Sequence, residues 1–211
     1  MRYKENDFII AILMWLRIAA LNDSQPSAGS SLHDWYPLHI VSGASSPRLI
    51  IVCGLPGSGK TTRAKLLESR LGAIRFCPDE WMNALAIDLY DSKMRERIEG
   101  LQWKLVQELL TAGQTVIIEW GTWARSERDT LRLRARTLGA AVELHFLDAS
   151  IDVLFERIQH RRHECPPIER DDLSRWAESF EAPSPEEMAL FDAPTVFGRE
   201  HLQSPSHARG L

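Results

Sequence analysis

Short apolar runs alternate with longer stretches of helical periodicity from residue 48 to about residue 190. These runs are rich in β-branched residues, as expected for strands. They are Leu49–Cys53, Ile74–Cys77, Thr115–Glu119 and Val142–Leu147, with a weaker fifth at Thr195–Phe197. The first three are almost continuously apolar, which is typical of strands whose two faces are both covered. The pattern predicts an α/β fold, a three-layer parallel sheet of about five strands with helices on both faces.

The stretches between the apolar runs predict the covering helices. They are residues 60–71, 80–90, 92–112, 125–138, 151–162, 169–181 and 185–191. In the longest helix, apolar residues such as Met94, Ile98 and Leu101 recur at three- and four-residue steps, which predicts one buried face. Gly113 then ends this helix, because glycine is the usual residue just past a helix C-terminus.

The start of the chain follows a different pattern. Residues 8–16 form an apolar run behind Arg2 and Lys4, a pattern that a short signal peptide would share. Arg17 interrupts the run, and its length is far below the ~20 residues that span a bilayer. We favour an amphipathic helix on or outside the folded domain, with no membrane span.

A linker is predicted by residues 22–47, which are rich in Ser, Pro and Gly. We therefore expect two regions. Residues 1–46 form an N-terminal apolar helix and linker, and residues 47–211 form the folded domain.

Composition and charge restrict the class of protein. The chain has 211 residues, of which 44% are hydrophobic and 26% charged, so it has the composition of an ordinary globular protein. Its net charge of −4 provides no general attraction to nucleic acid or anionic membrane. Cys53, Cys77 and Cys165 share no metal-binding spacing, which argues against a structural zinc site and fits a reducing compartment.

The strongest motif is GLPGSGKT at residues 54–61, a full match to G-x-x-x-x-G-K-[ST] between a predicted strand and a predicted helix. Such a loop turns backbone N–H groups inward, and the next helix adds its positive N-terminal end, so the loop binds phosphate. The predicted nucleotide-binding residues are Gly54, Leu55, Pro56, Gly57, Ser58, Gly59, Lys60, Thr61 and Thr62. Lys60 reaches the β- and γ-phosphates, and Thr61 binds Mg²⁺. The alternative is a glycine-rich turn with a surface lysine, which the strand and helix on either side disfavour.

Three further motifs suggest a family. They are FCPDEW after the second strand, TVIIEWGTWARSER around the end of the third, and FERIQHRR near residue 160. With the glycine loop, they make residues 48–163 resemble small P-loop kinases of the AAA-domain, zeta-toxin, chloramphenicol phosphotransferase and polynucleotide 5′-kinase group. The resemblance implies the P-loop nucleoside triphosphate hydrolase fold in its nucleotide-kinase-like form. It also implies Mg-ATP as cofactor and a hydroxyl acceptor. No NKxD or DxxG motif stands at a suitable strand end, so ATP is favoured over GTP.

By this resemblance, Asp79 accepts the proton of the substrate hydroxyl or orients that hydroxyl. Asp79 follows the second strand, at the edge of the sheet where open α/β proteins bind ligands. The alternative is an N-cap for a helix that begins at Glu80, since Asp is a good capping residue. Glu80 is the reserve candidate for the base.

Glu119 ends the third strand, where an acid of such kinases holds Mg²⁺ through water. Family members commonly have Asp at this position, and the longer Glu changes the reach of the carboxylate. Contact of Glu119 with the substrate therefore stays open as an alternative to contact with the metal.

Arg157 and Arg161 are four residues apart on one predicted helix, so their guanidinium groups project from one side. In nucleotide kinases this place carries a lid that closes over the transferred phosphoryl group, and we expect a lid near residues 157–168. Positive charge around that group stabilises the transition state. The alternative is surface charge paired with Glu156 and Glu164.

The acceptor is expected to contact residues after the third strand. Trp120 and Trp123 flank Gly121 and offer flat apolar faces to a ring-shaped substrate. Arg125 and Arg128 begin the next helix, three residues apart, and are candidates for holding a substrate or phosphate. The alternatives are core packing for the indoles and a solvated helix face for the arginines.

Together, these observations predict an ATP-dependent kinase that phosphorylates a hydroxyl of a small molecule such as an antibiotic, sugar or nucleoside. A kinase for nucleic-acid 5′-ends is a rival, but the net charge of −4 argues against it. A nucleotide-dependent switch or toxin-like module is the rival from another class. Because the reaction consumes a cytoplasmic nucleotide, we expect the protein in the cytoplasm. Its oligomeric state is left open.

Overall fold

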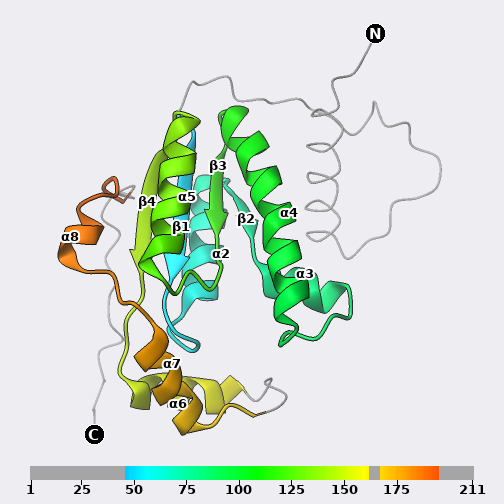
Figure 1. Cartoon of the computed structure of the whole chain (residues 1–211), viewed down its shortest axis with the longest axis vertical. Coiled ribbons are helices and arrows are strands. Elements are labelled where there is room, and N and C mark those ends of the chain that lie inside the picture. The colour runs from blue at the N-terminus through cyan, green and yellow to red at the C-terminus, as the bar shows by residue number, and fades with distance from the viewer. Residues whose placement is uncertain (1–45, 162–166, 195–211) are drawn as a thin grey trace, which may run out of the picture.

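One parallel sheet forms the centre of the molecule (Figure 1). The structure is a computed structural model that describes residues 46–161 and 167–194. The strands are β1 (Arg48–Cys53), β2 (Ile74–Phe76), β3 (Thr115–Ile118) and β4 (Ala141–Phe146), in the spatial order β2-β3-β1-β4. Every neighbouring pair is parallel. This confirms the predicted α/β parallel sheet. The weak fifth run at 195–197 lies outside the described residues, and so does the predicted N-terminal region, residues 1–46, except for residue 46.

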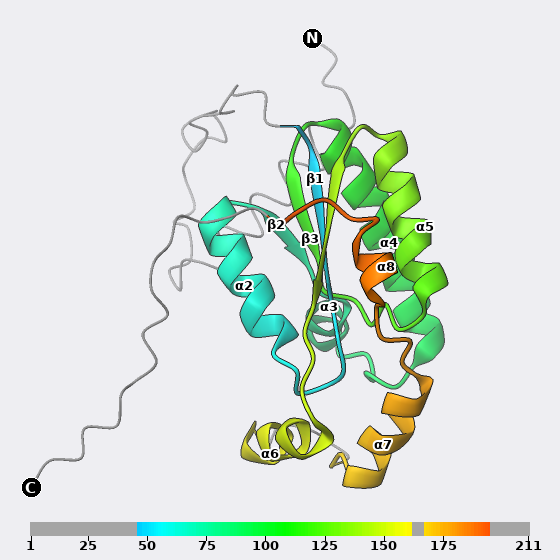
Figure 2. The same cartoon turned by 90° about the vertical axis from the view of Figure 1, so that its left-hand side faces the viewer.

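Helices cover both faces of the sheet, as Figure 2 shows. The helix α2 (Lys60–Leu71) packs Ala64 and Leu67 against one face. The helices α4 (Ser92–Thr111) and α5 (Arg125–Thr137) cover the other face. Alternate residues of β1 face opposite layers, with Ile50 on the α2 side and Ile51 on the α4 side, and both are fully buried. This explains why the strand sequence is continuously apolar.

Four shorter helices lie around this framework: α3 (Pro78–Ala84), α6 (Ile151–Arg161), α7 (Arg170–Ser179) and α8 (Pro185–Met188). The helix α3 begins and ends earlier than the predicted 80–90. Proline with its fixed φ suits the first turn of a helix, and Pro78 occupies that place. The helices α6 and α7 form a separate apolar cluster around Leu154 and Leu173, below the sheet in Figure 1.

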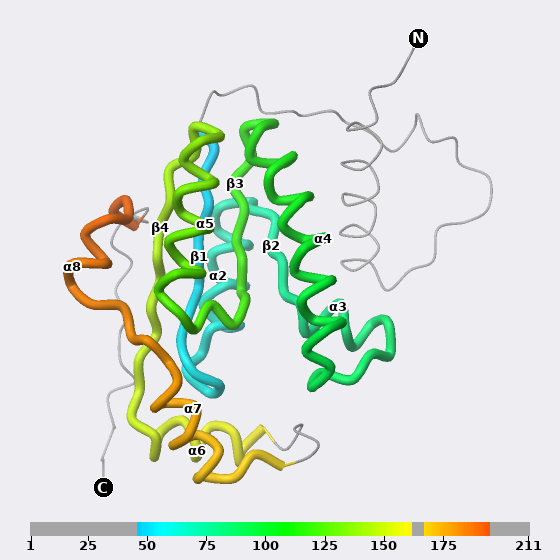
Figure 3. Tube along the Cα trace, in the orientation of Figure 1, coloured from blue at the N-terminus to red at the C-terminus, as the bar shows by residue number. Residues whose placement is uncertain are grey.

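All four strands end at one edge of the sheet because they are parallel. In the trace of Figure 3, the chain leaves β1, β2 and β3 at this edge. The neighbours β1 and β3 lead to helices on opposite faces, α2 and α5 respectively. Such a change of face opens a crevice in which α/β proteins bind ligands. No helix of residues 46–161 or 167–194 is long and apolar enough to cross a bilayer.

Candidate functional site

The glycine loop connects β1 to α2 and depends on close backbone contacts. Gly54 has φ 142° and Gly57 has φ 82°, a region that residues with a side chain rarely adopt. A Cβ at Gly54 would lie 2.4 Å from the carbonyl oxygen of Leu147, and one at Gly57 would lie 2.7 Å from that of Leu154. The loop therefore curls tightly against the chain that follows β4, which only glycine permits.

Lys60 begins α2 and lies against the loop. Its Nζ donates a hydrogen bond to the carbonyl oxygen of Leu55 at 3.1 Å. Burial lowers the pKa of Lys60, and the nearby carboxylates of Glu119 and Asp79 partly offset this effect. Both predicted acids, which follow the ends of two other strands, therefore act electrostatically on the predicted phosphate-binding lysine.

Thr61 and Glu119, the predicted metal pair, are in direct contact. The Thr61 hydroxyl donates a hydrogen bond to one carboxylate oxygen of Glu119, and Nη1 of Arg75 donates to the other at 2.8 Å. Among the described residues, no three His, Cys, Asp or Glu side chains gather as a metal-binding group. A hydroxyl and one carboxylate still fit Mg²⁺, which usually keeps several waters and takes its remaining ligands from substrate phosphates.

Arg75 is a residue of the site that sequence reasoning missed. Its side chain is only 6% exposed, and it also forms ion pairs with Glu80 at 2.6 Å and Glu68 at 3.4 Å. The pKa of Arg75 is raised overall. Burial acts to lower it, but the hydrogen bond from Arg75 to Glu80 and the negative charge of Glu80 outweigh the effect of burial. The available signal was a charged residue inside the apolar run IRFC. Arg75 holds Glu119 and Glu80 in place from the middle of β2.

Asp79 lies in the first turn of α3, and the N-cap of that helix is Cys77. The alternative in which Asp79 caps a helix beginning at Glu80 is therefore wrong. The carboxylate of Asp79 is half-exposed and accepts a hydrogen bond from Nη2 of Arg95 at 2.6 Å. Arg95 comes from α4 and had no sequence signal beyond its helical position. It fixes the direction of the Asp79 side chain.

Two further helices contribute carboxylates that interact electrostatically with one another and with Asp79. Glu99 lies one turn after Arg95 on α4, and Glu127 lies in the first turn of α5. Burial raises the pKa of Glu99 from its usual 4.5 to about 7, and the charges of Glu127 and Asp79 add to this rise while Arg95 opposes it. The candidate base therefore has both the Arg95 guanidinium and further carboxylates in its surroundings.

Replacement of Glu99 by glutamine is expected to stabilise the protein in a pH-dependent way. The folded protein holds the Glu99 proton more tightly than the unfolded chain, so the associated stability is complete below about pH 4.5 and is lost as the pH rises through about 7. Because Glu99 is only partly buried, solvent screening reduces the effect, and we expect Glu99→Gln to gain about 1–2 kcal/mol at pH 8. Urea unfolding at pH 8 and pH 5 measures this gain, which should shrink at pH 5. Equal stability of Glu99→Gln and the wild type at pH 8 would contradict it. Glu178→Gln, which changes an exposed glutamate of α7, is the control.

The predicted lid arginines lie beside the glycine loop. Nη1 of Arg157 donates to the carbonyl oxygens of Gly57 and Ser58, both at 3.4 Å. Arg157 and Arg161 also line a pocket of about 380 Å³. The other residues around this pocket are Ser58, Gly59, Thr62, Arg63 and Leu66. The position of Arg157 and Arg161 beside the loop agrees with the predicted lid, and their role in phosphoryl transfer stays a prediction. Residues 162–166 of the predicted lid lie outside the described stretches of the chain.

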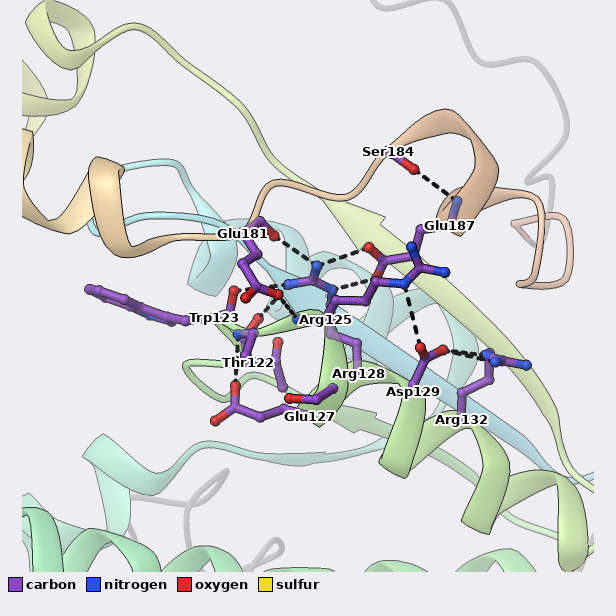
Figure 4. Close-up of polar contacts among 12 residues, drawn as sticks. Thr122, Trp123, Arg125, Glu127, Arg128, Asp129, Arg132, Glu181, Ser184 and Glu187 are labelled. Atoms are coloured by element: carbon purple, nitrogen blue, oxygen red, sulfur yellow. Dashed lines mark hydrogen bonds and ion pairs between the residues drawn. The ribbon is translucent and has the colours of Figure 1, made fainter.

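The structure corrects the prediction for Arg128 (Figure 4). Its side chain is fully buried, and all its N–H donors are used. Two bonds go to the Glu187 carboxylate at 2.6 and 3.0 Å, and the others go to carbonyl oxygens of Thr122, Trp123 and Glu181. No donor is left for a substrate. Arg128 instead fastens the loop after β3 to the segment between α7 and α8.

Arg125 is half-exposed, and its side chain forms an ion pair with Asp129 at 3.5 Å. Its backbone N–H donates to the carboxylate of Glu181 at 2.7 Å. The side chain of Arg125 is accessible from solvent, so a role in binding the acceptor stays a prediction.

The two tryptophans of the predicted acceptor pocket differ. Trp120 is buried in the main core, where its ring meets the ring of Trp103 edge-on at 6.4 Å. Core packing therefore explains Trp120, and the prediction that it faces a substrate is wrong. Trp123 is partly buried and contacts Trp176 and Phe180 edge-on, each at 6.3 Å. In Figure 4 its indole extends away from Arg128, and its role at the acceptor side stays a prediction.

Loss of Arg128 is expected to destabilise the fold strongly. Arg128→Ala leaves the buried Glu187 carboxylate without its partner, which costs about 3–5 kcal/mol. Chemical denaturation measures this loss, and Arg134→Ala, an exposed arginine of the same helix, is the matched control. The double variant Arg128→Met, Glu187→Leu should recover some of the loss, because it leaves no unpaired charge. An Arg128→Ala variant within about 1 kcal/mol of the wild type would contradict the structural role.

The fold and the loop agree with a known family. The model of a family described as AAA domain (AAA_33) matches residues 49–183, and the chain belongs to this family.

Individual proteins with similar sequence or structure include kinases. A nucleotide-binding protein of Stenotrophomonas maltophilia is 28% identical over 122 residues, which are 58% of this chain and 38% of that protein. The present chain thus matches well under half of that relative's length. A sugar kinase from Janibacter is 26% identical with a TM-score of 0.51, covering 67% of this chain and 82% of that one. Kti12 from Chaetomium thermophilum, solved with ADP-AlF3, is 23% identical with a TM-score of 0.51, covering 65% and 82%. These findings confirm the resemblance to P-loop kinases and the nucleotide-kinase-like fold.

Proposed function

We propose that this protein is an ATP-dependent kinase that transfers the γ-phosphate of Mg-ATP to a hydroxyl of a small molecule. The observation that carries the proposal is the contact of Glu119 with Thr61 beside Lys60, whose charge both Glu119 and Asp79 stabilise. Lys60 and Thr61 follow the glycine loop after β1, and Glu119 and Asp79 follow β3 and β2, which supports their roles as phosphate-binding cation, metal-binding pair and candidate base. The family and the similar sugar kinase support nucleotide-dependent phosphotransfer.

The glycine loop binds the β- and γ-phosphates with its backbone N–H groups and with Lys60. Thr61 and Glu119 would hold Mg²⁺, with Arg75 keeping the Glu119 carboxylate in position. When bound, the ion neutralises charge that develops on the phosphate oxygens. Contact of Glu119 with the acceptor is the alternative use of the same carboxylate.

In the proposed reaction, Asp79 orients the acceptor hydroxyl and takes its proton. The acceptor oxygen forms a bond to the γ-phosphorus, the bond from that phosphorus to the β,γ-bridging oxygen breaks, and ADP leaves with the electron pair. Arg95 aims the Asp79 carboxylate and leaves it half-exposed, so an acceptor can reach it. Arg157 and Arg161 would supply the positive charge around the equatorial oxygens.

A small acceptor fits the surroundings of Asp79 better than a nucleic-acid end. The Glu127 carboxylate, and Glu99 in its ionised form, repel a chain of phosphates, whereas nucleic-acid binding depends on neutralising phosphates with cations. Among the predicted acceptor residues, Trp123 and Arg125 remain in the proposal, whereas Trp120 and Arg128 are excluded by their burial.

We also propose that the protein works in the cytoplasm, where ATP is supplied. Cys53 and Cys77 are free and buried, and burial raises the pKa of each thiol to about 11. Unpaired, protonated thiols are compatible with a reducing compartment.

The direct test of the function is incubation with γ-labelled ATP and a panel of sugars, nucleosides and hydroxyl-bearing antibiotics. We expect ADP and a labelled acceptor to form in equal amounts, and Lys60→Ala to form neither. Lys65→Ala, an exposed lysine of the same helix, is the matched control and should behave as the wild type. Slow release of phosphate that no compound of the panel accelerates would favour the nucleotide-dependent switch instead.

Asp79→Asn is expected to separate catalysis from binding. The amide keeps the shape of the side chain but cannot take a proton, so kcat should fall by roughly 10²-fold or more with little change in ATP affinity. Steady-state kinetics with the acceptor found above and a calorimetric titration of Mg-ATP measure the two effects. The exposed Asp171→Asn on α7 is the control. A variant with wild-type kcat would remove Asp79 from the chemistry.

A further inference from the structure

A line of polar side chains crosses the α2 face of the sheet, outside the groups used so far. Glu143 on β4 is fully buried and forms an ion pair with Arg48. Its other oxygen lies 2.9 Å from Nε2 of His145, two residues further along the strand. On the opposite side of the ring, Nδ1 of His145 lies 3.4 Å from Nε and 3.3 Å from Nη2 of Arg63. The line therefore joins β4 to the first turn of α2.

The chemistry of the partners fixes the role of each atom. Arginine can only donate, and an ionised carboxylate can only accept. Nδ1 of His145 therefore accepts from Arg63, and Nε2–H donates to Glu143. Glu143 and His145 pair in the sheet with Ile50 and Val52, which are fully buried apolar residues. Placing a carboxylate and an imidazole there carries a desolvation cost that apolar side chains would avoid, so core packing alone does not explain them.

Arg63 is the half-buried outer end of this line and lines the pocket of about 380 Å³ beside the glycine loop. The pocket lies between α2, which contributes Thr62, Arg63 and Leu66, and α6, which contributes Arg157 and Arg161. It also shares Ser58 and Gly59 with the loop, so a group attached to a bound phosphate can enter it. Its volume is in the range of small-molecule sites.

Three arginines and one exposed leucine line this pocket, so it offers guanidinium planes and an apolar surface to a flat ring that follows a phosphate chain. Leu66 is apolar and 40% exposed, and it provides a hydrophobic contact surface. The bonds to His145 occupy Nε and Nη2, one edge of the Arg63 guanidinium, and these are the hydrogen bonds of the Arg63 side chain within the described residues. The plane of the guanidinium is thus fixed, while its face and Nη1 stay available. Guanidinium planes stack on aromatic faces, as a nucleobase requires.

We propose that Arg63 binds the nucleoside moiety of the nucleotide and that His145, backed by Glu143, is a positioning residue that holds Arg63 in its binding orientation. This inference rests on the proposed nucleotide-dependent function. It assigns a purpose to a buried Glu–His pair that the phosphoryl transfer itself does not use. The competing explanation is that the line only ties α2 to β4 and contributes stability.

The test is a calorimetric titration of Mg-ADP and of Mg-tripolyphosphate into the wild type, Arg63→Ala, His145→Leu and the double variant. We expect each single variant to bind Mg-ADP about 10-fold more weakly, the scale of a guanidinium stacked on an aromatic ring away from water. Binding of tripolyphosphate, which has no nucleoside, should change less than about twofold. Because His145 acts through Arg63, the double variant should bind Mg-ADP no more weakly than Arg63→Ala.

Further variants separate positioning from stability. His145→Gln keeps an acceptor and a donor on a neutral side chain and should restore much of the Mg-ADP affinity. Arg63→Lys keeps the charge but not the planar edge and should bind Mg-ADP as weakly as Arg63→Ala. Should His145→Leu not fold, the comparison of Arg63→Ala, Arg63→Lys and His145→Gln still tests the proposal. Lys65→Ala on the same helix is the control.

Each contrary outcome has a definite meaning. If Arg63→Ala and Arg63→Lys bind Mg-ADP as tightly as the wild type does, the inference is overturned while the proposed function stands. An equal loss of tripolyphosphate and ADP binding would make Arg63 a phosphate ligand and overturn the nucleoside assignment. If His145→Leu folds and melts at a lower temperature but binds Mg-ADP as tightly as the wild type, the polar line only stabilises the contact between α2 and β4, and the positioning role of His145 is overturned. A wild type that binds neither compound would overturn the proposed function as well.

Discussion

The close contact between the glycine loop and the chain after β4 is the constraint on which the site depends. The backbone at Gly54 and Gly57 approaches the carbonyl oxygens of Leu147 and Leu154 so closely that a Cβ would clash at either position. This contact curls the loop at the end of β1. It also sets α6, with Arg157, directly against the loop. The packing of the loop against the chain after β4 therefore positions both the backbone of the glycine loop and Arg157, the candidate lid arginine.

Charge is balanced around this loop by residues from several strands. Burial would weaken the positive charge of Lys60, and the carboxylates of Glu119 and Asp79 counteract that effect. Both acids are in turn held by arginines, Arg75 for Glu119 and Arg95 for Asp79. Because each ion pair joins different elements, the geometry of the site is fixed by the packing of the sheet and α4.

Local patterns of the sequence predicted the sheet, most helix bounds and the glycine loop, because apolar periodicity and glycine placement act within short segments. They also predicted Thr61 and Glu119 as a metal pair, and the two side chains are in contact. They failed where the outcome depends on contacts between distant segments. Arg128 was predicted to bind a substrate, but it is buried against Glu187, which is 59 residues away in the sequence. Trp120 was predicted to face a substrate, but it packs against Trp103 of α4. The local sequence gives the type of each side chain and its position on a helix or loop, but it does not give the distant residue that packs over that side chain.

The most direct test of the account is a calorimetric titration of Mg-ATP into the wild type and Gly57→Ala. We expect saturable binding at one site in the wild type and its loss in Gly57→Ala, with circular dichroism showing that the variant is folded. Gly100→Ala is the control, since nothing lies within 4 Å of a Cβ at that position, and it should bind as the wild type does. No saturable binding in the wild type, or equal binding in Gly57→Ala, would contradict the central claim that the glycine loop holds the nucleotide.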